Sequence, residues 1–176
     1  MLLINQREAE MGKRQLLFIT YYSENFNEGL SYVIDLAKIM NRGITALMIY
    51  KKSLTEKFED FMTAVAFAEA NEHDTARMFI AEDFKKVDAN ANANEKIASL
   101  FKSCRESGVD ADIYITKKDI TTAIKDFLEL KTSIDMVLLS PSVTNNEGLS
   151  AKELKRLVRT VSRPIVTMAR NVKEVS

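Results

Sequence analysis

The side chains best suited to bind or transfer a chemical group are concentrated in one polar segment, residues 140–152. The segment follows an apolar run, residues 136–139, and precedes an amphipathic helix, which is where an open α/β sheet usually holds phosphate. Loops of that kind contain several glycines, because the backbone must approach the anion closely. Here Gly148 is the single glycine, and Pro141 lacks an N–H donor. The pattern therefore predicts the position of a phosphate loop without its usual residues.

The segment still offers polar groups that could donate to an anion at the N-terminus of the last helix. Two tyrosines end the first apolar run, and with them the candidate crevice consists of Tyr21, Tyr22, Ser140, Ser142, Asn145, Gly148, Ser150 and Lys152. Lys152 opposes the helix dipole, which mildly favours an anion nearby. A polar turn followed by an ordinary helix cap explains the same residues, and both interpretations stay open.

Other combinations of reactive residues are sparse. His73 is the only histidine, and although Glu69 stands four residues before it, the charged neighbours are typical of a solvated helix face. Cys104, the only cysteine, falls on the apolar stripe of a helix, which predicts a buried thiol. Asp119 and Glu24 are better interpreted as helix-start residues than as catalytic carboxylates. We therefore expect no enzyme activity and no metal site.

Composition narrows the class of protein further. The chain has 176 residues, 46% of them hydrophobic, which is enough for one well-buried domain. Its 25 basic and 25 acidic residues cancel, so no net field attracts nucleic acid or an anionic membrane surface. No run reaches the ~20 apolar residues of a membrane helix, and apolar residues 1–4 lack the basic flank of a secretory signal. We expect a cytoplasmic protein without membrane insertion.

The elements that must position the polar segment alternate between short apolar runs and amphipathic stripes. Five strands are expected, at residues 16–20, 44–50, 111–116, 134–139 and 164–169. Helices are expected between them, with apolar faces spanning residues 30–40, 97–104, 120–128 and 154–161. The first is expected to end at Arg42-Gly43, and the last two to begin at the capping residues Asp119 and Ser150. This alternation predicts an α/β fold with a five-stranded parallel open sheet, order 3-2-1-4-5, covered by helices on both faces.

Some segments do not fit the alternation. Residues 1–14 form a polar N-terminal arm, and a Phe-rich helical insertion at 54–86 interrupts a single domain spanning 15–170. The insertion holds five of the nine phenylalanines, more than one docked helix needs. An extra helix that closes over the sheet edge and a partner-binding element that uses Phe58 and Phe61 both explain this excess. The low-complexity residues after it predict a connector.

Several strand-end motifs resemble the universal stress protein family over roughly residues 15–170. Residues 16–24 are similar to the family's opening strand and its Asp-Gly-Ser-Glu, although two tyrosines replace the Asp and the Gly. Residues 134–139 resemble its Ala-Asp-Leu-Ile-Val-Met strand, residues 163–168 its closing Cys-Pro-Val-Leu-Val-Val, and residues 118–119 its Gly-Asp helix start. The resemblance implies an adenine-nucleotide-hydrolase-like fold.

The ATP-binding branch of that family carries Gly, two residues, Gly, nine residues, and then Gly with Ser or Thr. When the chains are aligned on the proline before the last strand, Ser140 takes the first glycine position and Ala151-Lys152 the final pair. The family's acid on the first strand is replaced by Tyr21. The resemblance therefore implies the branch that does not bind ATP. Its members are regulators that mostly form homodimers, often through the last strand, here Pro164, Ile165, Val166, Thr167 and Met168.

Three functional hypotheses follow. The first is a cytoplasmic regulator of the universal stress type, homodimeric and active in stress-response signalling, which needs no cofactor and does not bind ATP. The second is a switch that binds ATP, another adenine nucleotide or a different anion through residues 142–152 in place of a glycine loop. The third is a docking subunit that captures a transporter or an enzyme through Phe58 and Phe61.

Overall fold

A computed structural model of the chain describes residues 14–23, 25–50, 84–87, 95–145 and 148–168. The arm except Arg14, most of the insertion and the connector lie outside the described residues. The same holds for five residues named above: Glu24, Phe58, Phe61, Glu69 and His73.

The five predicted strands form the parallel part of one sheet: β1 (Gln15–Tyr21), β2 (Gly43–Ile49), β4 (Ala111–Thr116), β5 (Ile134–Leu139) and β6 (Ile165–Thr167). They lie in the order β4-β2-β1-β5-β6, which is the predicted 3-2-1-4-5 arrangement. β1 and β2 occupy the centre and bury nearly every side chain, because helices cover both faces of the sheet. This double burial explains why the two strands read as continuous apolar runs rather than as alternating patterns.

The predicted number of strands is wrong by one. A short strand, β3 (Lys85–Val87), pairs antiparallel with β4 at the sheet edge, so the sheet is mixed and has six strands in the described part of the chain. Phe84 and Val87 are buried there, whereas Lys86 lies 3.6 Å from the Asp112 carboxylate. Two of the three strand residues are lysines, so the apolar pattern is too short to indicate a strand. The sequence interpretation placed most of β3 inside the insertion.

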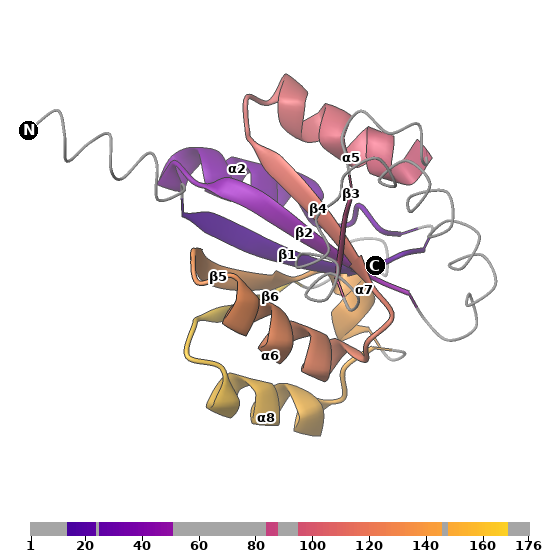
Figure 1. The fold of residues 1–176 in the computed structure, drawn as a ribbon, viewed down its shortest axis with the longest axis vertical. Coiled ribbons are helices and arrows are strands. Elements are labelled where there is room, and N and C mark those ends of the chain that lie inside the picture. Colours follow the sequence, from indigo (N-terminus) through magenta and orange to yellow (C-terminus); the bar gives the residue numbers. More distant parts are fainter. Residues whose placement is uncertain (1–13, 24, 51–83, 88–94, 146–147, 169–176) are drawn as a thin grey trace, which may run out of the picture.

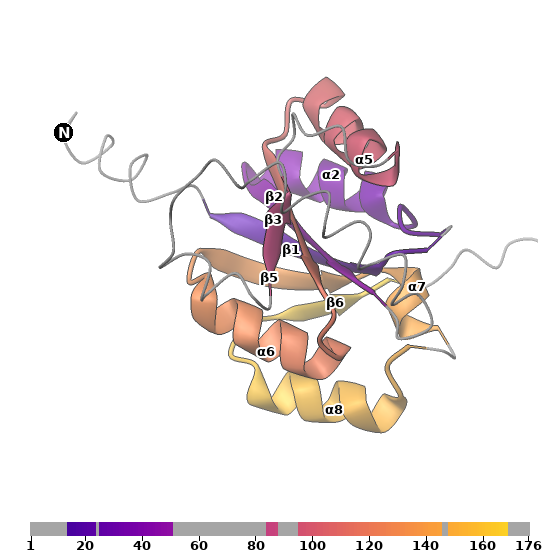
Figure 2. The same ribbon diagram turned by 45° about the vertical axis from the view of Figure 1, so that its right-hand side comes forward.

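Among the described residues, two long helices cover each face of the sheet (Figures 1 and 2). α2 (Leu30–Met40) and α5 (Glu95–Glu106) pack into one apolar core, and α6 (Ile120–Leu130) and α8 (Ala151–Thr160) into the other. A single turn of helix, α7 (Pro141–Thr144), follows β5. Cys104 is fully buried in the first core, as expected, and burial raises the pKa of its thiol to about 11. The thiol is therefore protonated and unreactive at neutral pH.

The helix ends are set by residues that the sequence mostly identifies. The Asp119 side chain accepts from the Thr122 backbone N–H at 3.3 Å and so caps α6. The end of α2 differs from the expectation, because Asn41 and not Gly43 takes the left-handed conformation, with φ of 54°. In the part of the chain that the structure describes, no helix combines the length and the apolar character needed to cross a bilayer.

Candidate functional site

The candidate crevice lies where β1 and β5 end, next to each other in the middle of the sheet. In open α/β sheets this is the topological switch point, where ligands usually bind beyond the carboxyl ends of the strands. The structure brings the two predicted halves of the crevice together, since the Ser140 N–H donates to the Ile19 carbonyl at 3.0 Å. The position is therefore suited to a site, and the question is which of its groups are available.

Three hydroxyl groups form a chain between the ends of β1 and β5. Ser142 Oγ lies 2.7 Å from Ser140 Oγ, which donates to Thr20 Oγ1 at 3.3 Å, and Thr20 donates to the Phe26 carbonyl at 2.8 Å. Thr20 and Ser140 are fully buried, and Ser142 is partly exposed. The hydroxyls thus satisfy one another, as buried polar groups must. Thr20 is a site residue that the sequence analysis did not predict, although this polar residue directly follows the apolar residues 16–19 of β1.

Tyr21, the last residue of β1, and Tyr22, which follows it, point to opposite faces of the sheet, as successive residues of an extended chain do. Tyr21 is buried in the core beneath α6 and α8, and its pKa is raised by burial and, less strongly, by the nearby Glu153 and Asp119 carboxylates. Tyr22 lies on the other side and stacks on Tyr50, with ring centroids 4.4 Å apart and planes 14° apart. Tyr21 therefore belongs to the core, and only Tyr22 faces the helices α2 and α5.

The Tyr22 ring contacts a cation as well as an aromatic ring. The Lys96 ammonium lies 5.0 Å from its centroid, a distance at which the cation and the ring attract each other. Tyr50 beneath it is 4% exposed, and its pKa is raised mainly by burial and further by Tyr22. Burial therefore keeps the Tyr50 phenol neutral near pH 7, and the cluster Tyr22, Tyr50 and Lys96 contains no carboxylate.

The loop after β5 folds back on α7 and uses its own backbone donors. The N–H groups of Val143 and Thr144 donate to the Ser140 carbonyl, and those of Gly148 and Leu149 donate to the Asn145 and Val143 carbonyls, each at 2.8 to 3.3 Å. A Cβ at Gly148 would lie 1.7 Å from the Val143 carbonyl oxygen, so only glycine allows this approach. Gly148 therefore closes the loop on itself.

The last two candidate residues lie at the start of α8. Ser150 accepts from the Glu153 N–H and donates to the Glu153 carboxylate, both at 3.1 Å, so it caps α8 as the sequence predicts, although the carboxylate is bonded to the Ser150 hydroxyl and not to its backbone N–H. Lys152 is exposed one residue into the helix. The described residues contain no group of three or more His, Cys, Asp and Glu side chains placed to hold a metal ion. Chemically, the residues described at this edge offer hydroxyl and phenol groups that already have partners within the chain, together with the exposed ammonium of Lys152.

The chain was compared with known proteins at the level of families, sequences and structures. No family model matches it, and no curated protein matches it. The solved structure of the hypothetical protein MJ0577 is 14% identical, with a TM-score of 0.54, over 90% of this chain and 97% of that one. A universal stress protein from Archaeoglobus fulgidus is 10% identical, with a TM-score of 0.50, over 93% and 98% of the two chains. The chain therefore has the universal stress protein fold that its strand-end motifs predict.

Proposed function

We propose that this protein is a cytoplasmic regulator of the universal stress type, which acts in stress-response signalling through contacts with proteins and does not bind ATP. The observation that supports this proposal best is the use of backbone donors in the loop after β5. A phosphate loop presents several free N–H groups to the anion. Here the N–H groups of Val143, Thr144, Gly148 and Leu149 all donate to carbonyls of the same loop.

The other parts of a nucleotide site fit this chain no better. A base needs an aromatic or apolar face to stack on, and the Tyr22 ring is already in contact with Tyr50 and Lys96. A ribose needs an acceptor for its hydroxyls, and the position of the family's acid is taken by Tyr21, which is buried in the core. An adenine nucleotide does not match the described residues at these positions.

Calorimetry with ATP and Mg²⁺ tests this part of the proposal. We expect no binding heat at nucleotide concentrations up to about 1 mM, a range that detects all but the weakest complexes. The matched variant is Tyr22→Ala, which removes the ring from the crevice but leaves the loop intact. It should also bind no ATP, because the loop donors stay occupied. Saturable ATP binding by the unmodified protein would refute the proposal, and binding by the variant alone would place the barrier at the ring.

The proposed mode of assembly is a homodimer through β6. This strand lies at one end of the described sheet and pairs only with β5 there. The Pro164 carbonyl and the Met168 N–H both face β5. The Val137 N–H donates to the Pro164 carbonyl, and the Met168 N–H donates to the Leu139 carbonyl. Successive residues of a strand direct their N–H groups to alternate sides, so those of Ile165 and Thr167 point to the open edge of the sheet. Such an edge can accept a strand from a second copy.

The dimer is tested by replacing one outward N–H. Thr167→Pro removes that donor, whereas Thr167→Ala keeps it and serves as the control. We expect light scattering to give a dimer for the unmodified protein and for the alanine variant, and a monomer for the proline variant. A monomeric unmodified protein at micromolar concentration would contradict the proposed assembly. Dimers of both variants would place the interface elsewhere.

A further inference from the structure

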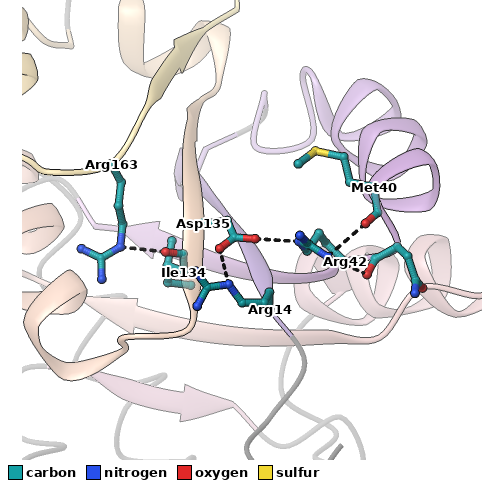
Figure 3. Close-up of polar contacts among 7 residues, drawn as sticks. Arg14, Met40, Arg42, Ile134, Asp135 and Arg163 are labelled. Carbon is teal, nitrogen blue, oxygen red and sulfur yellow. Dashed lines mark hydrogen bonds and ion pairs between the residues drawn. The ribbon is translucent and has the colours of Figure 1, made fainter. Parts of the chain in front are cut away.

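Three arginines gather at the edge of the sheet opposite the crevice, where β1, β5 and β6 begin. Figure 3 shows Arg14 and Arg42 on either side of the Asp135 carboxylate, with Arg163 at the neighbouring residue Ile134. The three come from different parts of the chain: the approach to β1, the turn between α2 and β2, and the turn before β6. The fold thus brings together three guanidinium groups that are far apart in the sequence.

Each of these guanidinium groups is held through its Nε atom. Arg14 Nε lies 2.5 Å and Arg42 Nε 2.6 Å from the two oxygens of Asp135, and Arg163 Nε donates to the Ile134 carbonyl at 2.7 Å. A guanidinium is planar, so a bond at Nε fixes the plane in which all its N–H groups lie; one terminal nitrogen lies on the same side as the Nε–H, and the other points away from the bonded group. The Arg14 side chain is 60% exposed. Its two terminal nitrogens are therefore already oriented before any ligand arrives.

The charges at this edge do not balance. The contacts among the described residues bring one carboxylate, Asp135, to two guanidinium groups, while the third, that of Arg163, is bonded at Nε to the neutral Ile134 carbonyl. Arg42 also donates from Nη1 to the carbonyls of Met40 and Asn41 at 3.2 and 3.5 Å, so both its Nε and its Nη1 groups are bonded within the fold. Arg163 makes one further contact, at 3.4 Å to the Ser162 hydroxyl. Arg14 and Arg163, which contact consecutive residues of β5, are left with most of their terminal donors and the surplus positive charge.

We propose that Arg14 and Arg163 bind a phosphate group at this edge, with Arg42 and Asp135 as positioning residues. Oriented guanidinium forks bind trigonal and tetrahedral oxyanions through paired N–H···O bonds, and a doubly charged phosphate matches the surplus charge. The net charge of the chain is zero, so the attraction is local and does not extend over the long surface that a nucleic acid would need. The ligand is either a free phosphate ion or a phosphorylated side chain of a partner.

Nuclear magnetic resonance of the arginine Nε–H groups tests the proposal directly. The full chain is titrated with inorganic phosphate, and separately with the peptide acetyl-Gly-phosphoserine-Gly-amide, at constant ionic strength maintained with chloride. We expect saturable shifts of the Arg14 and Arg163 resonances and of the Arg42 Nε–H resonance, which reports binding in variants that lack the other two arginines. The variant Arg14→Gln/Arg163→Gln should lose at least about tenfold in affinity, whereas the matched control Arg156→Gln/Arg159→Gln, on the exposed side of α8, should change by less than about twofold.

Comparison of the two titrations distinguishes free phosphate from a phosphorylated partner, and the variants test whether the arginines bind it. Tighter binding of the peptide than of the ion points to a phosphorylated partner, and equal affinities point to free phosphate. Arg14→Lys/Arg163→Lys keeps both charges but loses the forks, so it should bind more weakly than the unmodified protein while staying folded by circular dichroism. The proposal is wrong if neither probe shifts the Nε–H resonances, or if both double arginine-to-glutamine variants bind equally well.

Discussion

Replacement of Asp135 tests what stabilises the edge of the sheet where β1, β5 and β6 begin. Its carboxylate is 16% exposed and joins β5 to the approach to β1 and to the turn after α2, through Arg14 and Arg42. Hydrogen bonds to charged groups contribute about 1.5–3 kcal/mol when buried, and exposed ion pairs about 0–1 kcal/mol. Arg42 is 32% exposed and Arg14 60% exposed, so the Arg42 contact should account for most of the effect.

From these values we expect Asp135→Ala to lower the free energy of unfolding by about 2 kcal/mol. For a domain of this size that corresponds to a fall in melting temperature of about 4–8 °C. Asp135→Asn keeps the shape and one acceptor oxygen, so it should lose less, about 1–1.5 kcal/mol. Urea denaturation followed by circular dichroism measures both, and an unchanged slope of the transition verifies that only stability has changed.

Double-mutant cycles separate the two arginines. The coupling between Asp135→Asn and Arg42→Gln should be about 1 kcal/mol, and that between Asp135→Asn and Arg14→Gln below about 0.5 kcal/mol. Sodium chloride at high concentration should reduce the Arg14 coupling more, because that pair is the more exposed one. A loss below about 0.5 kcal/mol for Asp135→Ala, or a larger coupling to Arg14 than to Arg42, would refute this reasoning.

Two further predictions concern the loop after β5 and the buried side chains of Tyr50 and Cys104. Gly148→Ala should destabilise the protein by about 2–3 kcal/mol, because the new methyl group meets the Val143 carbonyl. Gly108→Ala, with φ of 73° and open space around it, should cost only about 1–2 kcal/mol; equal losses in urea titrations would argue against the close approach at Gly148. Burial raises the pKa of Tyr50 and raises that of Cys104 to about 11. Above pH ~9 the unfolded chain releases these protons while the folded chain keeps them, so the free energy of unfolding should fall as pH rises. In Tyr50→Phe the free energy of unfolding should fall less steeply with pH. An identical pH dependence for the variant and the unmodified protein would contradict the raised pKa of Tyr50.

The parts of the fold that follow from the sequence are those where one residue pattern has one physical explanation. A parallel strand buried on both faces must be apolar throughout, and residues 16–20 and 44–50 show this. Helix caps are equally local, which is why the sequence pattern correctly predicts Asp119 and Ser150 as capping residues. β3 could not be identified, because its stability comes from pairing with β4 and from two buried residues at its ends.

The candidate site was only partly predictable, because its groups are defined by partners that lie far away in the sequence. Thr20 and Ser140 are 120 residues apart, and only the adjacency of β1 and β5 joins their hydroxyls. The split of Tyr21 and Tyr22 to opposite faces follows from strand alternation, and the sequence interpretation treated them as a pair. The stacking partner Tyr50 belongs to a different strand exit, which no local motif connects to Tyr22.

The low glycine content of residues 140–152 predicts a loop unlike a phosphate loop, and the backbone contacts of the loop supply a reason for this prediction that the glycine count does not contain. A glycine can serve a ligand or can let two backbone segments meet, and a count of glycines does not distinguish these roles. Pro141 starts α7 directly after Ser140, and Gly148 then returns the chain to Val143. This return is what consumes the N–H groups that an anion would otherwise need. Insertion of glycines elsewhere in the loop would therefore not by itself create a phosphate site, because the donors would still face the chain's own carbonyls.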